Sequence, residues 1–179
     1  MTVARPRSRR TRLDPEIFDL PVEKMRDGYY SDAYFNHTRA ALLHDGRRPR
    51  VVMQLFQRHH AMLGGMDESI AILELCSHDW PGLTVHALRD GDRVEPWDTV
   101  MTIEGDYTSF GHLETVVLGT LARRTLIGHD ASSQVWAGQV SVPGRRSGSR
   151  VGSPRYPGGN VAASSSGVGV FLTRASSGS

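Results

Sequence analysis

The residue types that most often carry catalysis are present, but their spacing matches no common catalytic or metal-binding motif. The eight histidines include the adjacent pair His59-His60, whose side chains would point to opposite faces of a strand, and none lies in an HExxH pattern. The single cysteine, Cys76, has no second cysteine to pair with, and we expect it to be a small buried side chain. Phosphate-binding glycine loops are also missing from the sequence. The motifs therefore predict neither a catalytic residue nor a metal ligand in this chain.

Two adjacent arginines are the strongest candidates for binding an anion. Arg123 and Arg124, followed by Thr125, come at the end of the most strongly periodic apolar segment of the chain. Guanidinium groups bind phosphate or carboxylate well, but cations at this end of a helix also offset the helix dipole. The sequence favours both interpretations equally, and Thr125 is the weaker member of the set. His112, earlier in the same segment, is expected on the surface.

Charge is distributed unevenly along the 179 residues. Residues 13–129 contain eleven Lys or Arg and eighteen Asp or Glu, a net charge of −7, whereas both ends are basic. A nucleic-acid-binding protein would gather basic charge on a folded face, so we expect no nucleic-acid partner. No apolar run reaches the roughly 18 residues that cross a bilayer. With one cysteine and no hydrophobic segment after the arginine-rich start, the sequence predicts a cytoplasmic protein with no membrane partner.

Hydrophobic periodicity predicts a mixed α/β domain between residues 13 and 127. Asp14-Pro15-Glu16 is typical of a helix start, and a second helix is expected from Ser31 to His44 with Ser31 as its cap. A strand, a helix, two strands and a last helix follow, at Arg50–Gln57, Asp67–Cys76, Leu83–Leu88, Thr99–Glu104 and Thr108–Ile127. The last helix carries one apolar stripe, made of Phe110, Leu113, Val117, Leu118 and Leu121.

Both ends of the chain are expected to be disordered. Residues 1–12 form a basic arm, and residues 128–179 lose all hydrophobic periodicity. Residues 130–179 contain twelve Ser and nine Gly, which leaves too little apolar surface to offset the entropy of ordering. We therefore divide the chain into an arm 1–12, a folded domain 13–127 and a tail 128–179.

Five separated segments of the folded domain resemble the amino-terminal part of nicotinate phosphoribosyltransferases, in the same order and at similar spacing. They are 31–35 (SDAYF), with the family's Asp-x-Tyr motif, 52–57 (VMQLFQ), 65–68 (GMDE), 90–105 (DGDRVEP and VMTIEG), and 110–127, from Phe110 to Ile127. Each segment is weakly specific, but together they span most of the domain. The resemblance stops abruptly at Gly128, where the composition also changes, so we expect a shifted reading frame or a spliced end there.

The resemblance implies a quinolinate-type phosphoribosyltransferase plan, in which an amino-terminal α+β sandwich packs on an α/β barrel that is missing here. The implied reaction of NAD biosynthesis joins nicotinate to 5-phosphoribosyl 1-pyrophosphate with Mg²⁺ and coupled ATP hydrolysis, in a homodimer. Most of the site would lie in the barrel. We therefore expect this chain alone to be an inactive fragment that supplies no catalytic residue and binds neither Mg²⁺ nor ATP tightly.

The resemblance also assigns Tyr34 and Asp32 to the substrate site, where they would reach the site of the neighbouring subunit. Tyr34 would stack on the pyridine of nicotinate, since offset stacking suits two flat rings, and Asp32 would orient neighbouring groups. The alternative for Tyr34 is an ordinary core aromatic beside Phe35. Arg123, Arg124 and Thr125 would complete the substrate-binding set.

Two other functions remain open. One is a quinolinate phosphoribosyltransferase-like fragment, for which more basic residues would be expected because quinolinate has two carboxylates. The other is a non-catalytic interaction module that pairs with a full-length enzyme. For the truncated enzyme, we expect the helix Thr108–Ile127 to leave part of its apolar face uncovered without the barrel, so that the chain is marginally folded, self-associates or needs a full-length partner.

Overall fold

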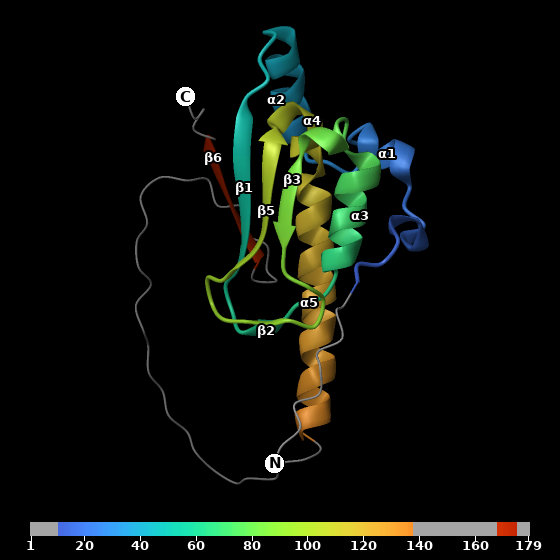
Figure 1. The fold of residues 1–179 in the computed structure, drawn as a ribbon, viewed down its shortest axis with the longest axis vertical. Coiled ribbons are helices and arrows are strands. Elements are labelled where there is room, and N and C mark those ends of the chain that lie inside the picture. Colours follow the sequence, from blue (N-terminus) through green and yellow to red (C-terminus); the bar gives the residue numbers. More distant parts are fainter. Residues whose placement is uncertain (1–10, 138–167, 175–179) are drawn as a thin grey trace.

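The computed structural model describes residues 11–137 and 168–174, with side chains described for residues 11–125 (Figure 1). The helices are η1 Pro15–Phe18, α1 Val22–Arg26, α2 Ala33–His44, α3 Met66–Cys76, η2 Trp80–Gly82, α4 Tyr107–Phe110, η3 Gly111–Leu113 and α5 Glu114–Ala137. The strands are β1 Arg50–Gln57, β2 Ala61–Met62, β3 Thr84–Ala87, β4 Arg93–Val94, β5 Thr99–Asp106 and β6 Val168–Arg174. This arrangement confirms the α+β fold class, and the described residues form no barrel.

The main sheet is antiparallel and has the strand order β3-β5-β1-β6. β1 and β5 pair from Arg50 opposite Asp106 to Phe56 opposite Thr99, with a register shift between Leu55 and Phe56. β2 and β4 form a separate two-stranded ribbon. Helices α3 and α5 lie side by side against the sheet, which makes a two-layer sandwich (Figure 1).

The core fills the space between these two layers. β1 and β5 contribute side chains from alternate positions, as expected for strands with one buried face, and α3, α4, η3 and α5 supply the opposite side. The cluster includes Met53, Leu55, Met101, Ile103, Ile72, Leu73, Phe110, Leu113, Val117 and Leu121, each 1% exposed or less. Cys76 is fully buried in this cluster, as predicted, and burial raises the pKa of its thiol.

The apolar stripe of the last helix is covered, so the expectation of an exposed apolar face was wrong for these residues. Phe110, Leu113, Val117, Leu118 and Leu121 are at most 8% exposed. The sheet and α3 together approach the helix from two sides, which covers a wider arc than the sheet alone. The helix also differs at both ends from the predicted Thr108–Ile127. The carboxylate of Asp106 caps the separate turn α4 through the Thr108 amide at 2.9 Å, and α5 continues to Ala137.

Parts of the predicted disordered ends belong to the fold. β6 pairs antiparallel with β1 from Val51 opposite Arg174 to Gln57 opposite Val168. The apolar run in Val168–Arg174 was masked by the Gly and Ser content of the whole tail. At the amino-terminal end, Arg12 donates to Asp67 Oδ1 at 2.7 Å. It also donates to the carbonyl oxygens of Ala87 and Leu88, at the end of β3. The predictions for residues 1–10, 138–167 and 175–179 lie outside the described residues.

The sequence predicted the N-terminal cap of the first helical turn correctly and that of the second helix wrongly. Asp14 accepts from the Glu16 amide at 3.0 Å and caps η1, as the sequence predicted. For the second helix, Asp32 rather than Ser31 occupies the cap position, and its side chain makes no capping hydrogen bond. α3 is capped from a distance, because the Asp90 carboxylate accepts from the amides of Met66 and Asp67 at 2.8 and 3.1 Å. This contact joins two of the segments that carry the family resemblance.

Candidate substrate-binding cleft

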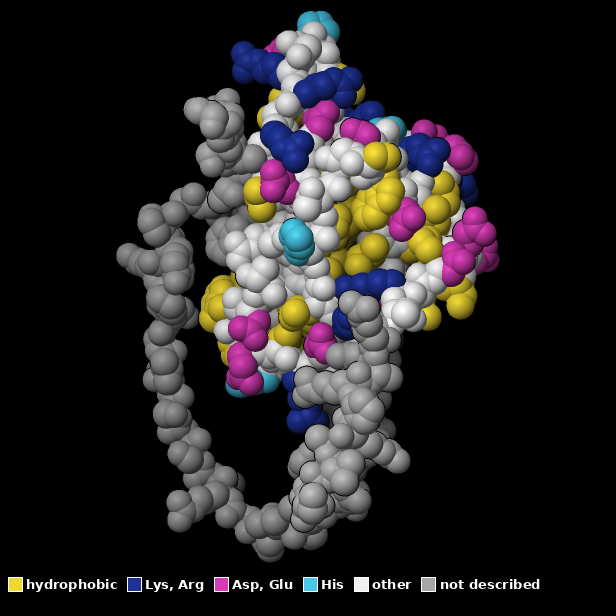
Figure 2. All heavy atoms as spheres, viewed as in Figure 1, with side chains coloured by type: hydrophobic (Ala, Val, Ile, Leu, Met, Phe, Trp, Pro, Cys, Tyr) yellow, Lys and Arg dark blue, Asp and Glu magenta, His cyan; other side chains and the backbone are white. Residues whose placement is uncertain are grey.

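A cleft of about 510 Å³ opens along the solvent side of α5. α5 forms one wall, and α1, the segment before α2, and α3 contribute the rest. The lining residues are Met25, Tyr30, Glu68, Thr115, Val116, Gly119, Thr120, Arg123 and Arg124. Hydrophobic side chains also gather on the face in view around α1 and α3, bordered by charged ones (Figure 2). The size of the cleft is in the range of small-ligand sites.

The structure places both predicted arginines in this cleft, but only one of them is unpaired within the described part of the chain. Arg124 Nε donates to Glu68 Oε2 at 2.8 Å, and this hydrogen bond raises the pKa of the guanidinium further. Arg123 is exposed and has no hydrogen bond or ion pair with any described residue. Arg123 is therefore the cation that a bound anion would meet in the cleft.

Thr125 lies away from the cleft lining. It is 2% exposed, and its hydroxyl both accepts from the Gly64 amide at 3.2 Å and donates to the Gly64 carbonyl at 3.3 Å. This pair of bonds holds α5 against the turn that precedes α3. A Cβ on Gly64 would lie 2.7 Å from the Arg124 carbonyl oxygen, so the close approach requires glycine. The structure thus gives Thr125 a packing contact, and its predicted place in the substrate set has no support from this geometry.

Tyr34 and Asp32 stand at the start of α2, next to one end of the cleft. Tyr34 is 66% exposed and meets Phe35 edge-on at 5.5 Å, so the alternative of a core aromatic was wrong. The Asp32 amide donates to Thr115 Oγ1 at 3.4 Å, and Thr115 lines the cleft. Arg123 lies eight residues further along α5, which corresponds to about 12 Å of helix. Tyr34 itself is not a lining residue, and the aromatic side chain that lines the cleft is Tyr30.

The sequence analysis gave no role to Glu114, a buried acid at the start of α5. Glu114 is 6% exposed, and its Oε2 is buried without a hydrogen-bond partner. Burial and the negative charge of Asp32 raise its pKa to about 7. Burial, Glu114 and Tyr34 in turn raise the pKa of Tyr107. The first turn of a helix usually exposes an acid, so the sequence carried no signal for this burial.

His112 was expected on the surface, and this expectation was wrong. It is 2% exposed, neither ring nitrogen has a hydrogen-bond partner, and its ring lies 5.0 Å from that of His78. Burial, then His78 and Arg39, lower its pKa to about 4. The ring is therefore neutral at pH 7 and contributes to packing at the junction of α3 and η3.

The described part of the chain has no cluster of metal-binding side chains. No three His, Cys, Asp or Glu side chains of that part of the chain gather closely enough to hold a metal ion. The Mg²⁺ and ATP implied by the resemblance stay predictions. Within the same residues, no helix has both the length and the apolar character needed to span a membrane.

Comparison with known proteins places this geometry in a family. Residues 32–125 match the family model described as quinolinate phosphoribosyl transferase, N-terminal domain. The chain belongs to this family. The matched range begins at Asp32 and ends at Thr125, so it contains all five predicted substrate residues. A search of the curated proteins found no match.

Solved structures of similar fold come from the same group of enzymes. NadC from Streptococcus pyogenes has a TM-score of 0.56 and 24% identity over 70% of this chain and 43% of that one. Human nicotinic acid phosphoribosyltransferase has a TM-score of 0.51 and 18% identity over 67% of this chain and 32% of that one. Nicotinate-nucleotide pyrophosphorylase from Pyrococcus furiosus has 26% identity and a TM-score of 0.49 over 58% of this chain and 27% of that one. The chain therefore spans less than half the length of these proteins.

The match to the quinolinate phosphoribosyl transferase N-terminal domain covers the region that resembles nicotinate phosphoribosyltransferases. The five segments that resemble nicotinate phosphoribosyltransferases fall almost entirely inside the matched range 32–125. Two of these segments, 65–68 and 90–96, are distant in the sequence but meet in the fold at the start of α3. Membership of this family leaves the substrate of the chain unconfirmed, although the family model is named after quinolinate.

Proposed function

We propose that this domain forms part of the substrate site of a phosphoribosyltransferase of NAD biosynthesis that joins nicotinate to 5-phosphoribosyl 1-pyrophosphate. The observation that carries the proposal is an unpaired guanidinium, Arg123, in a cleft whose other end is tied through Thr115 to the start of α2, where the Tyr34 ring is exposed. The family membership of residues 32–125 supports the reaction class. The expected homodimer stays a prediction.

Tyr34 is suited to hold the pyridine ring. Its edge-on contact with Phe35 leaves the ring free to take a flat ligand, and Phe35 packs against the core and so limits the movement of the pair. Offset stacking between two aromatic rings contributes roughly 0.5–1.5 kcal/mol beyond the burial of area. Placing the ring costs little, because the short turn before α2 is already tied to α5 through Thr115.

Arg123 is suited to the anionic end of the substrate pair. The separation of about 12 Å between Thr115 and Arg123 is comparable to the length of a pyridine mononucleotide from ring to phosphate. A guanidinium binds phosphate oxygens through two parallel hydrogen bonds. Among the described residues, the cleft offers one unpaired guanidinium, because the guanidinium of Arg124 is already paired with Glu68. A second carboxylate, as in quinolinate, would have no cation of its own there, which favours nicotinate.

Quinolinate is the second candidate substrate. The name of the matched family model favours it. In that case cations from outside the described residues would have to serve the second carboxylate. The two candidates thus predict different affinities for the cleft itself.

A titration of the 179-residue chain tests the proposal. Nicotinate, quinolinate and phosphoribosyl pyrophosphate are added separately while the Tyr34 ring and Arg123 Nε signals are followed by NMR. We expect nicotinate to shift the Tyr34 ring, and Tyr34→Ala to weaken its binding about fivefold, as loss of one stacking contact predicts. Tyr29→Ala is the matched control, since Tyr29 is also exposed but meets Tyr30 and not the α2 ring Phe35. Tighter binding of quinolinate would support the second candidate, and no response at either residue would contradict both.

A further inference from the structure

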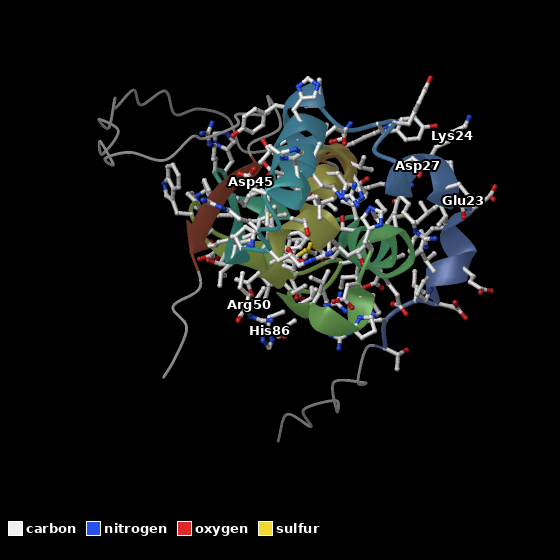
Figure 3. All side chains as sticks on the ribbon, turned by 90° about the horizontal axis from the view of Figure 1, so that it is seen from above. Glu23, Lys24, Asp27, Asp45, Arg50 and His86 are labelled. Atoms are coloured by element: carbon white, nitrogen blue, oxygen red, sulfur yellow. The ribbon has the colours of Figure 1, made fainter. Side chains whose placement is uncertain are left out.

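β6 binds along the side of β1 that β5 leaves free. The strand order is β3-β5-β1-β6, so β6 has one neighbour among the described strands (Figure 1). Residues 168–174 run antiparallel to β1, from Val168 opposite Gln57 to Arg174 opposite Val51. Figure 3 shows β6 at the edge of the sheet that lies away from α1. A distant segment of the chain therefore completes the sheet at this edge.

β1 is held in the fold by contacts that do not involve β6. Its other side pairs with β5 from Arg50 to Phe56. Met53 and Leu55 are 1% exposed or less and belong to the core between the sheet and the helices. Backbone N–H and C=O groups alternate in direction along an antiparallel strand, so every second residue of β1 presents them away from β5. The free edge of β1 is therefore in place before a further strand pairs with it.

β6 is connected to the domain differently from the other strands. Thirty residues, 138–167, separate it from the end of α5 at Ala137, whereas the other described strands all lie between Arg50 and Asp106. Closing a connection of this length costs entropy, and it holds the attached segment at an effective concentration of about a millimolar. β6 therefore occupies the edge of β1 in the manner of a bound peptide that is covalently attached to its receptor.

The register shows which residues this edge accepts. Val170 stands opposite Leu55, and Leu172 stands opposite Met53. These two β1 residues are among the most buried of the domain, so the sequence is apolar at the positions that pair with the core side of β1. In strand addition, the main-chain hydrogen bonds give the affinity and alternate side-chain positions give the specificity. A strand for this edge thus needs apolar residues at two alternate positions.

A third position is marked by an aromatic pair. Gly169 stands opposite Phe56. The Phe56 ring is 2% exposed and stacks on Trp97 with 5.3 Å between the ring centroids and 22° between the planes. An aromatic residue across from an edge glycine compensates for the missing side chain of the glycine. The pattern that fits the edge is therefore Gly-Φ-x-Φ, where Φ is an apolar residue.

We propose that the free edge of β1 is a binding site for an extended strand of a partner polypeptide, and that Val168–Arg174 occupies it when no partner is bound. The partner strand runs antiparallel to β1 and carries the Gly-Φ-x-Φ pattern, with its glycine opposite Phe56. A second copy of this chain is a poor donor, because its own residues 168–174 are held beside its own β1. The site is separate from the substrate cleft, whose lining residues include none of the sheet, and each proposal holds or fails without the other.

The test asks whether the strand binds without its covalent connection. The probe is the capped peptide of residues 168–174, VGVFLTR, titrated into the ¹⁵N-labelled 179-residue chain. The double variant Phe171→Pro with Leu172→Pro weakens the in-chain strand, because proline has no N–H to donate and is disfavoured inside strands. We expect saturable shifts of the β1 amide signals in this variant. The original chain should need about tenfold more peptide, because its own strand competes at the effective concentration that the connection sets.

Control peptides separate strand pairing from general hydrophobic binding. A reordered peptide of the same composition, VVGFTLR, breaks the Gly-Φ-x-Φ pattern and should bind the double variant about tenfold more weakly. Two further peptides carry N-methyl groups at residues 169, 171 and 173 or at residues 170 and 172. Every second N–H of an edge strand faces its neighbour, so one methylated peptide should lose binding and the other should keep it within about twofold. Ser176→Pro with Ser177→Pro, beyond β6, is the control variant and should behave as the original chain does.

The original chain decides if circular dichroism shows that the double variant is unfolded. The peptide should then shift the β1 amide signals of the original chain at about millimolar concentration, and the two methylated peptides should still differ. Equal binding of the methylated peptides, or of the reordered peptide, would overturn the proposal, because pairing with β1 requires one set of amides and one pattern. Absence of any shift in β1 would overturn it as well. A dimer of the original chain at low micromolar concentration that the double variant does not form would show that a second copy supplies the strand, against the partner proposed.

Discussion

The guanidinium of Arg124 donates to the carboxylate of Glu68 at 2.8 Å and thereby joins α5 to α3 at the cleft. The two neighbouring arginines consequently differ in what they do. Arg124 completes a contact within the fold, whereas Arg123 presents an unpaired charge to the same cleft.

Substitution of the two arginines should separate stability from binding. Arg124→Ala is expected to lower the free energy of unfolding by about 0.5–1 kcal/mol, a small value because half of the side chain is solvated. Arg123→Ala should leave the free energy of unfolding unchanged and abolish binding of inorganic pyrophosphate. Urea denaturation and calorimetric titration measure the two effects. Equal loss of pyrophosphate binding in both variants would contradict the division of roles.

Two glycines of the same region should respond oppositely to alanine. A Cβ on Gly64 would lie 2.7 Å from the backbone oxygen of Arg124, and we expect Gly64→Ala to destabilise the domain by about 1–3 kcal/mol. Gly119 lies within α5 with nothing within 4 Å of an added Cβ. Gly119→Ala should therefore stabilise the domain by about 0.5–1 kcal/mol, through helix propensity. Thermal melts of the two variants measure both effects. Destabilisation by Gly119→Ala would show that the cleft beside Gly119 is closed in solution.

Local patterns in the sequence were sufficient for the central elements of the fold. The apolar run in Arg50–Gln57 predicted β1 with the bounds that the structure has, and the spacing of the apolar stripe predicted which side chains of the last helix are buried. These features depend on the periodicity of one element, which the sequence displays directly.

Features that depend on distant partners could not be predicted in this way. β6 forms because β1 has a free edge, and nothing within Val168–Arg174 reveals that edge. Tyr34 and Phe35 are adjacent, so helical spacing could not decide which of them faces the core. Glu114 and His112 flank the core residue Leu113, and their burial results from the packing of neighbouring helices around them.

His112 should make the domain sensitive to acid. Its pKa is lowered to about 4 in the folded state, below the ordinary 6.5, so the unfolded chain takes up the proton first. The resulting stability is present above pH 6.5 and is lost as the pH falls through 4, by about 3 kcal/mol in total. His112→Leu should remove this part of the pH dependence. Urea midpoints between pH 7 and 4 measure it, with exposed His86→Leu as the control.

Glu114 should act in the opposite direction. Its pKa is raised to about 7 in the fold from an ordinary 4.5, so the folded state holds the proton more tightly than the unfolded chain. The stability associated with the protonated acid is fully present below pH 4.5 and is lost as the pH rises through 7, by about 3 kcal/mol. Glu114→Gln keeps the shape of the side chain and cannot ionise. The variant should therefore match the original chain at pH 4.5 and exceed it in stability at pH 8. Urea denaturation at the two pH values measures the difference, and Glu104→Gln, in an exposed pair with Arg50, is the control. A Glu114→Gln variant that is less stable at pH 8 would mean that the ionised carboxylate already has a partner in the isolated chain.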